Sequence, residues 1–166
     1  MSGKARDASG GKTVVRNKRA RFEYEILETI ETGIELLGAE VKSLREGRVN
    51  LADAYVRIEE EELFLVNLDI EPYSNAPAIY APPPRRKRRL LVHGRQLGKL
   101  HSRAAERGLT MIPLSVYFNE RGWAKVEVAL VRGKTHADRR EAMKKRSAQR
   151  EISRAMKGRN PRDARG

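Results

Sequence analysis

A chain of 166 residues has room for one domain with a tail, and with 34% charged residues part of the chain must stay outside any core. The absence of cysteine excludes disulfides, thiolate nucleophiles and thiolate metal sites. A formal net charge of +13 indicates a polyanionic partner.

The charge is arranged in blocks along the chain. Residues 1–21 carry seven basic residues and one acidic, residues 23–62 carry twelve acidic and four basic, and residues 85–107 carry nine basic and one acidic. Residues 132–166 hold thirteen basic residues against four acidic ones. One basic cluster is usually only a solvated face, but three in a small chain favour nucleic acid, because each cation that neutralises a phosphate releases a counterion.

The sequence contains no candidate membrane segment. The basic N-terminal stretch leads into no apolar run of the kind found in signal peptides. The uncharged, largely apolar run over residues 109–119 is about half as long as a membrane helix. The tail lacks Trp, Phe and Leu for anchoring on a membrane surface. We therefore expect a cytoplasmic protein without membrane contact.

Hydrophobic periodicity predicts short strands and one helix in the first half of the chain. Phe22, Tyr24 and Ile26 alternate with charged residues, the period of a half-buried strand. Gly47 is expected to stop the helix. The predicted elements are a disordered arm over 1–14, a strand over 22–30, a turn at 31–33, a strand over 34–37, a helix over 39–46, and a hairpin of 55–58 and 63–70 across a turn at 59–62.

The second half predicts one more helix and a long hairpin. Five of the seven prolines fall in residues 72–84, which predicts an irregular loop leading into the basic run 85–89. Strands are predicted at 110–118 and 124–130, across a turn at 119–122. Leu97, Leu100 and Ala104 are predicted to share one face of a helix that Gly108 ends. On the first of the two strands, one side is predicted to consist of Thr110, Ile112, Leu114, Val116 and Phe118. This inventory predicts a mainly β protein, an OB-like antiparallel β-barrel of about six strands with two or three short helices.

The basic tail has the composition of a helix. Residues 138–157 contain no Pro or Gly, and Asp138 is predicted as the N-cap with Glu141 three residues later. Its cations at i, i+4, i+8 and i+11 fall on one face of this helix: Arg146, Arg150, Arg154 and Lys157. Beside this cationic face lies a narrow apolar stripe of Ala148, Ile152, Ala155 and Met156. Because this stripe is too narrow to hold the helix on the barrel, we expect the tail to be disordered in the free protein and helical on RNA.

No catalytic or metal-binding constellation stands out. His93, His101 and His136 lack metal-ligand spacing, and the sequence has no Gly-rich phosphate loop or Ser nucleophile motif. The acidic run 59–62 is interpreted as a solvated turn. We therefore expect no enzymatic activity, no metal and no cofactor.

Several motifs occur in a specific order. They are NKRA at 17–20, GAEVKSLREGRVNL at 38–51, RKRRLLVH at 86–93, PLSVYF at 113–118, GWAKV at 122–126, and GK at 133–134 followed by DRR at 138–140. Each is ordinary alone, but in this order over residues 15–157 they resemble the SmpB family of SsrA-binding proteins. The sequence departs from the family pattern at Arg139, Ala148 and Ala155, which leaves the individual tail contacts open.

The resemblance implies an RNA-binding adaptor with an OB-type barrel over residues 15–131 and a basic tail over 132–166. Proteins of this family bind the tRNA-like domain of transfer-messenger RNA (tmRNA, or SsrA RNA) and deliver it to stalled ribosomes for trans-translation. The tail enters the decoding centre and the empty mRNA channel as a helix. A monomer without catalytic activity is expected. The alternatives are a general structured-RNA or ribosomal OB-fold binding protein and, more remotely, an RNA-processing enzyme.

Site residues follow by carrying the family's positions onto this chain. Those implied to bind RNA are Asn17, Arg19, Arg21, Glu40, Lys42, Ser43, Arg45, Arg86, Lys87, Arg88, Lys125 and Glu127. Those implied to bind the ribosome are Gly133, Lys134, Asp138, Arg139, Arg140, Arg146, Arg150, Arg154, Met156 and Lys157. Three alternatives stay open: a helix-start acid for Glu40, a solvated face for Lys125 and Glu127, and a solvated loop for the run 85–89.

Overall fold

Nine strands and four helices follow one another along residues 11–77, 79, 81–134 and 136–158, the residues that the computed structural model describes. In chain order they are β1 (Lys12–Arg16), α1 (Ala20–Glu23), β2 (Tyr24–Ile34), α2 (Gly38–Arg45), β3 (Val49–Asn50), β4 (Tyr55–Glu59), β5 (Glu62–Val66), β6 (Asp69–Ile70), β7 (Arg88–Leu91), α3 (Gly94–Ala104), β8 (Leu109–Phe118), β9 (Ala124–Gly133) and α4 (His136–Gly158).

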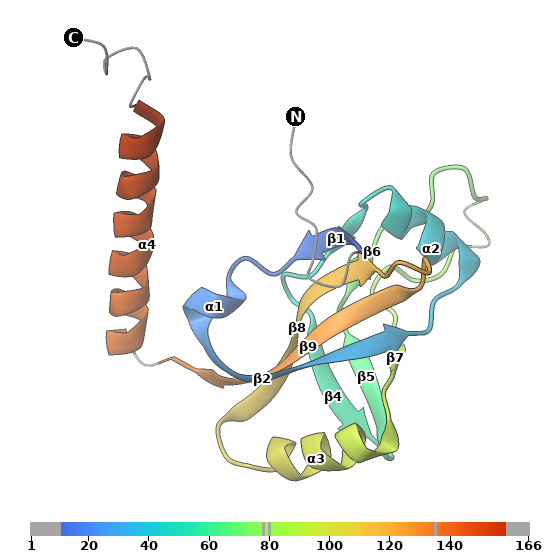
Figure 1. Cartoon of the computed structure of the whole chain (residues 1–166). Coiled ribbons are helices and arrows are strands. Elements are labelled where there is room, and N and C mark those ends of the chain that lie inside the picture. Colours follow the sequence, from blue (N-terminus) through green and yellow to red (C-terminus); the bar gives the residue numbers. More distant parts are fainter. Residues whose placement is uncertain (1–10, 78, 80, 135, 159–166) are drawn as a thin grey trace.

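Six of the strands pair antiparallel in a closed ring. Their order is β8-β4-β5-β7-β2-β9, and β9 pairs back onto β8, which closes the ring (Figure 1). Strand β1 pairs with β8 as a seventh strand, and the short β3 and β6 form a separate sheet. The prediction of a mainly β chain with about six antiparallel strands is therefore confirmed.

The two faces of the ring strands bury two apolar clusters. The main core joins residues from all six ring strands with Leu44 of α2 and Leu100 of α3, which are 0% and 3% exposed. Burying each of these leucines stabilises the fold by about 2–3 kcal/mol. Alternate residues of β8 and β9 point the other way and form a small outer cluster beneath α1. Its buried members are Ala20, Ile112, Leu114, Ala129 and Val131.

Strand β2 runs straight through residues 31–33, so the turn predicted there is wrong. Gly33 pairs with Leu91 of β7 on one side and with Lys125 of β9 on the other. A Cβ atom on Gly33 would lie 3.2 Å from the Leu91 Cβ, so this glycine permits close strand packing and does not reverse the chain. Phe22, predicted as the start of this strand, lies in α1.

Strand β8 contains a bulge that resets its alternation. The β8–β9 register shifts around Leu114. Ile112 and Leu114 therefore lie in the outer cluster, whereas Val116 and Phe118 lie in the main core. The prediction that these four residues share one face is wrong, because a periodic pattern does not reveal where one extra residue inverts it.

The remaining predicted elements are largely present. Helix α2 and the turns at 59–62 and 119–122 are confirmed, with Gly47 and Gly122 in the left-handed region at φ 77° and 81°. The predicted strand over 63–70 is interrupted at Asn67 (φ 61°), where the chain leaves β5 to form β6. Strand β7 contains Arg88 and Arg89 of the basic run, for which a solvated loop was one of the open alternatives.

The two chain ends differ from their predicted boundaries. Strand β1 begins at Lys12, so the limit of the disordered arm at residue 14 is wrong, and residues 1–10 of that arm lie outside the described residues. Strand β9 extends to Gly133, two residues past the predicted end of the barrel. Helix α4 confirms the predicted tail helix but begins at His136, so Asp138 lies in its first turn and not at its N-cap.

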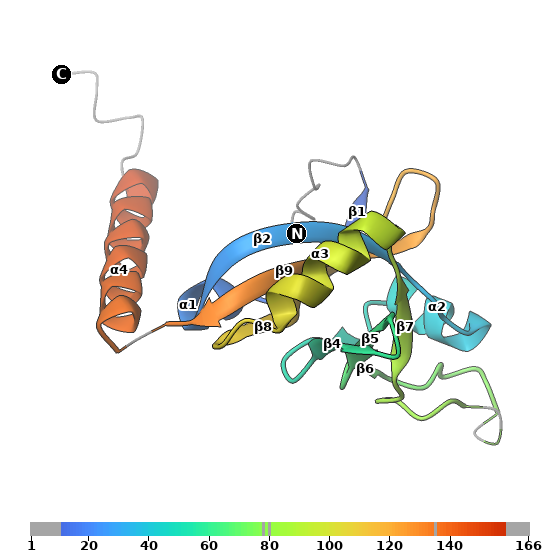
Figure 2. The same cartoon turned by 90° about the horizontal axis from the view of Figure 1, so that it is seen from below.

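Helix α4 stands apart from the ring and beside α1 (Figures 1 and 2). Ile152 and Met156 of its apolar stripe are 50% and 73% exposed. This exposure agrees with the expectation that the stripe does not hold the helix on the barrel. Disorder of the tail in the free protein stays a prediction, and residues 159–166 lie outside the described range.

Candidate nucleic-acid interface

The buried carboxylate of Glu40 holds two arginines of the basic run 85–89. Arg88 donates from Nε to Glu40 Oε2 at 2.6 Å, and Arg86 donates from Nε to Oε1 at 3.1 Å. The backbone N–H of Leu37 also donates to Oε1, at 3.0 Å. Glu40 therefore acts as the helix-start acid that was the alternative for this residue, and it also ties α2 to β7.

The guanidinium of Arg88 is satisfied inside the protein. Its Nη1 donates to the Leu68 carbonyl at 2.6 Å and its Nη2 to the Pro84 carbonyl at 3.0 Å. Burial lowers the pKa of Arg88 below its ordinary value, against the opposing effect of Glu40. Burial acts to raise the pKa of Glu40, but hydrogen bonds from Arg86, Leu37 and Arg88 outweigh it and hold this pKa below the ordinary value.

Three of the predicted RNA contacts lie in the interior. Glu40, Ser43 and Arg88 are 2%, 0% and 1% exposed. Direct contact with RNA would require the α2–β7 junction to open, so the assignment of these side chains as RNA ligands does not hold in this structure. They fix the position of α2 and of the exposed cations that it carries.

The other cations of the run are paired with carboxylates at the surface. Arg85 lies 3.5 Å from Asp53 and 3.4 Å from Asp69, Lys87 lies 2.5 Å from Glu59, and Arg89 lies 3.3 Å from both Glu35 and Glu62. The hydrogen bond from Lys87 lowers the pKa of Glu59. The run 85–89 is therefore neutralised within the protein, chiefly by the acidic block 23–62, and offers little free charge to a phosphate.

Helix α2 presents two exposed cations without a carboxylate partner among the described residues. Lys42 Nζ lies 5.4 Å from the centre of the Tyr73 ring, and the Arg45 guanidinium lies 4.7 Å from the centre of the Phe118 ring. Contacts with aromatic faces orient these side chains and leave their charge available. Lys42 and Arg45 thus remain candidates for phosphate contacts.

The N-terminal segment 17–21 is fastened to the bulge of β8. The Asn17 N–H donates to the Leu114 carbonyl at 2.7 Å, and its side-chain Nδ2 donates to the Pro113 carbonyl at 3.3 Å. Asn17 is thus occupied in holding the segment in place, whereas Arg19 and Arg21 are exposed. A hollow of about 560 Å³ lies between this segment and residues 50–54.

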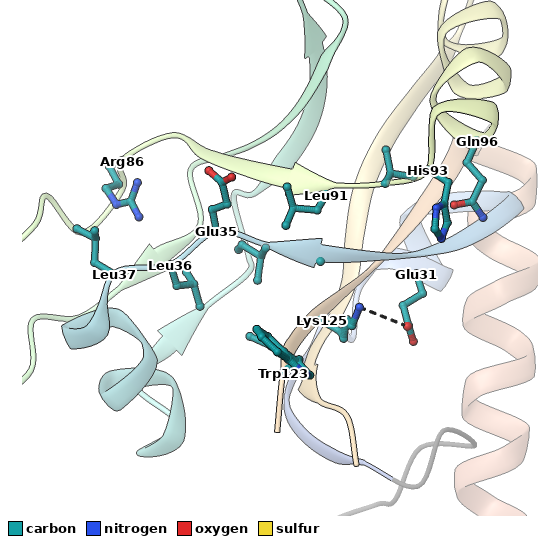
Figure 3. Close-up of a pocket in the computed structure, with 14 residues that line it drawn as sticks. Glu31, Glu35, Leu36, Leu37, Arg86, Leu91, His93, Gln96, Trp123 and Lys125 are labelled. Atoms are coloured by element: carbon teal, nitrogen blue, oxygen red, sulfur yellow. Dashed lines mark ion pairs between the residues drawn. The ribbon is translucent and has the colours of Figure 1, made fainter. Parts of the chain in front are cut away.

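A second hollow, of about 880 Å³, opens where β2, β7, α3 and β9 meet. Figure 3 shows Trp123 and Lys125 on one side of it, with His93 and Gln96 on another. Trp123 is 67% exposed. Lys125 Nζ lies 4.0 Å from Glu31 Oε1, and Tyr117 donates its hydroxyl hydrogen bond to the same carboxylate.

This hollow has the side chains that unpaired RNA requires. An exposed indole can stack on a base. The ammonium of Lys125, which lies at the long distance of 4.0 Å from Glu31, can exchange this carboxylate for a phosphate. Glu127, on the same strand face, accepts a hydrogen bond from Ser115 Oγ at 3.2 Å. Apart from Lys125 and Arg86, the residues that line this hollow were not among the predicted site residues, although a Trp placed just before the polar face of a strand could have indicated it.

The tail carries the least neutralised charge. Of its predicted ribosome contacts, Arg140, Arg146, Arg150, Arg154, Met156 and Lys157 are exposed. No described side chain of α4 lies within 4.0 Å of an opposite charge. The side chains of Asp138 and Arg139 lie outside the described residues. Lys134 lies at the tail's root, where its Nζ donates to the Arg21 carbonyl at 2.7 Å.

Metal ligation and membrane crossing find no structural support in the described part of the chain. Its His, Asp and Glu residues form no group of three that could hold a metal ion. None of the described helices is both long and apolar enough to span a membrane.

The ring-like sheet and the exposed cations around it describe a small β protein suited to a polyanion. A family model described as SmpB protein matches residues 14–158. The chain therefore belongs to the SmpB family, which confirms the resemblance seen in its motifs.

Individual relatives agree over most of their length. An SsrA-binding protein of Moorella thermoacetica is 53% identical over 148 residues, which cover 89% of this chain and 95% of the relative. One of Desulforamulus reducens is 46% identical over 159 residues, covering 96% and 98%. A chain of the solved structure described as "tmRNA-SmpB: a journey to the center of the bacterial ribosome" is 49% identical, with a TM-score of 0.62 and coverage of 78% of this chain and 93% of that chain.

Proposed function

We propose that this chain is an RNA-binding adaptor that binds the tRNA-like domain of tmRNA and delivers it to stalled ribosomes for trans-translation. The observation that carries this proposal is the extent of the family match, which runs from β1 to the end of α4. The ring and the basic tail are therefore both part of what the chain shares with proteins named for SsrA binding.

In this proposal the ring recognises the tRNA-like domain. Trp123 and Lys125 supply a stacking surface and a cation beside one hollow. Arg19 lines the other hollow, and Arg21 is exposed two residues further along the chain. Base–aromatic stacking contributes about 1–3 kcal/mol per base, enough to prefer an RNA that presents unpaired bases in the right place. The rigid strands below hold these groups in fixed positions.

The tail serves the ribosome. Arg146, Arg150 and Arg154 recur every four residues and therefore lie along one side of α4. A helix of 23 residues is about 35 Å long, which suits a segment that lies along a channel lined by RNA phosphates. The decoding centre and the empty mRNA channel are the proposed sites for this helix. The adaptor works in the cytoplasm and has no catalytic step of its own.

The direct test compares the intact chain with a chain truncated after Lys134, because β9 and the Lys134 contact are then kept. Each is titrated with a tRNA-like domain and with an unrelated hairpin of equal length at about 150 mM salt. We expect both forms to prefer the tRNA-like domain strongly and similarly, and Trp123→Ala to weaken that preference. Equal affinity for both RNAs would favour the general structured-RNA binder instead.

A further inference from the structure

We propose that Lys134 is a positioning residue whose contact with α1 fixes the direction in which the tail helix α4 leaves the ring. Its Nζ donates to the Arg21 carbonyl at 2.7 Å, and its backbone N–H donates to the Glu23 carbonyl at 3.1 Å. Both acceptors belong to α1. A single residue thus bonds the root of the tail to this helix twice.

Helix α1 is a firm support for such a contact. Ala20, 1% exposed, lies in the outer cluster with Leu114 of β8 and Val131 of β9. The two hydrogen bonds of Asn17 attach the preceding segment to the β8 bulge. The short helix therefore has covalent, apolar and hydrogen-bonded connections to the ring, and it moves with the ring.

The acceptor is a carbonyl group that α1 does not satisfy by itself. A helix leaves its last carbonyls without intrahelical partners, and lysine ammonium groups often occupy them. In α1 the cap N–H of Tyr24 returns to the Ala20 carbonyl, which leaves the Arg21 carbonyl for Lys134. The positive charge of Lys134 also lies at the negative end of the helix, where it is favourable.

Among the described residues, little else holds the tail to the body. Helix α4 begins two residues after Lys134, and α1 is the element that it contacts most. Figures 1 and 2 show α4 beside α1 and away from the strands of the ring. The described side chains of α4 form no ion pair with the ring, so the direction of the tail is set where its root meets α1, through the two Lys134 hydrogen bonds and the contact of α4 with α1.

The functional consequence rests on the proposed function. Arg19 and Arg21, which are candidates for RNA contacts, belong to the same α1 region as the Lys134 contact. The surface that grips the tRNA-like domain and the tail that enters the ribosome would therefore keep a fixed relation. A tail whose root is already aimed loses less orientational freedom when the tail becomes helical and binds, and this saving appears as affinity for the ribosome.

The first test measures the direction of the tail in the protein alone. Because the chain has no cysteine, two spin labels can be attached at Ser102→Cys on α3 and Glu141→Cys near the root of α4. Pulsed electron–electron double resonance then gives the distribution of the distance between the two spin labels. Lys134→Met keeps the aliphatic chain but removes the donor, Lys134→Arg keeps a donor, and Lys144→Met is the matched control on the exposed surface of α4.

We expect Lys134→Met to broaden or shift the distribution, and Lys134→Arg and Lys144→Met to leave it close to that of the parent chain. An unchanged distribution in Lys134→Met, or an equal change in Lys144→Met, would overturn the proposal. As a second readout, Lys134→Met should bind the tRNA-like domain normally and the ribosome about tenfold more weakly. The spin-label result needs no RNA, so it stands or fails separately from the proposed function.

Discussion

Two strongly basic segments of this protein have opposite environments. The run 85–89 consists of five consecutive cations, and each has a carboxylate within 4.0 Å. Helix α4 carries its described cations on an exposed surface without such partners. The two segments look alike in the sequence, yet only the second presents free positive charge.

The difference shows that the number of basic residues in a segment does not determine how much unpaired positive charge that segment presents on the surface. The acidic block 23–62 supplies Glu35, Glu40, Glu59 and Glu62 to the run, because β2 and β5 pair with β7 and because Glu40 of α2 and Glu59 at the end of β4 form ion pairs with it. Among the described residues, no carboxylate forms an ion pair with a cation of α4. Pairing by the fold therefore decides which of the basic blocks can bind a polyanion.

The largest expected effect comes from the buried end of the run. Arg88→Met removes one of the two arginines paired with a carboxylate that is 2% exposed. Because Arg86 still compensates Glu40, the loss should lie near or below the lower end of the about 3–5 kcal/mol that an uncompensated buried charge costs. Urea unfolding monitored by Trp fluorescence measures this loss. Lys42→Met on the exposed side of α2 is the control and should change the stability by less than about 0.5 kcal/mol.

The pair can be separated from its packing by a double-mutant cycle. Adding Glu40→Gln to Arg88→Met removes the buried charge that Arg88→Met leaves behind. The double variant should therefore be less destabilised than the sum of the two single variants. Additive losses would mean that the ion pair is not what holds α2 to β7.

A second prediction concerns the surface end of the run. Lys87 and Arg89 are neutralised by ion pairs with Glu35, Glu59 and Glu62. If these carboxylates are what prevents the two cations from binding RNA, then the triple variant Glu35→Gln, Glu59→Gln and Glu62→Gln should turn the surface around them into an RNA-binding surface. The affinity for an unrelated hairpin should rise, and its dependence on log[salt] should steepen by about 1.5 for the two cations released. An unchanged salt slope would show that these cations are inaccessible for another reason.

The smallest expected effect is a dependence on pH. The lowered pKa of Glu40 means that its contribution to stability is fully present above its ordinary value of 4.5 and is lost as the pH falls through the lower, folded-state value. The effect is small because burial opposes the hydrogen bonds from Arg86, Leu37 and Arg88. Unfolding free energies between about pH 6 and pH 3 should fall less steeply in Glu40→Gln than in the parent chain. Parallel curves would contradict this.

The sequence predicts the elements whose cause is local. The turns at 59–62 and 119–122, the stop of α2 at Gly47 and the tail helix follow from nearest-neighbour chemistry, and they are present. In the sequence Gly33 resembles a turn glycine, but its role is to allow the close approach of Leu91 from β7. Leu91 lies far along the chain, so this role has no local cause. The bulge at Leu114 likewise depends on pairing with β9.

The candidate site was predicted in part for the same reason. The exposure of the cations of α2 and α4 follows from helical periodicity, which is a local property of the sequence. The burial of Arg88 could not be foreseen, because it depends on Glu40 48 residues away. The hollow at Trp123 was missed because it is assembled from three ring strands and α3, and only the closure of the ring brings Trp123, Leu91 and His93 together.

The most direct test of the account removes two charges from each basic segment. Lys87→Gln with Arg89→Gln changes the paired run, and Arg146→Gln with Arg150→Gln changes the unpaired tail, so both variants lose the same charge. Ribosome binding is then measured over a series of salt concentrations. We predict that the tail variant lowers the slope of log affinity against log[salt] by about 1.5 and that the run variant leaves it unchanged. Equal losses in both variants, or a loss in the run variant alone, would contradict the account.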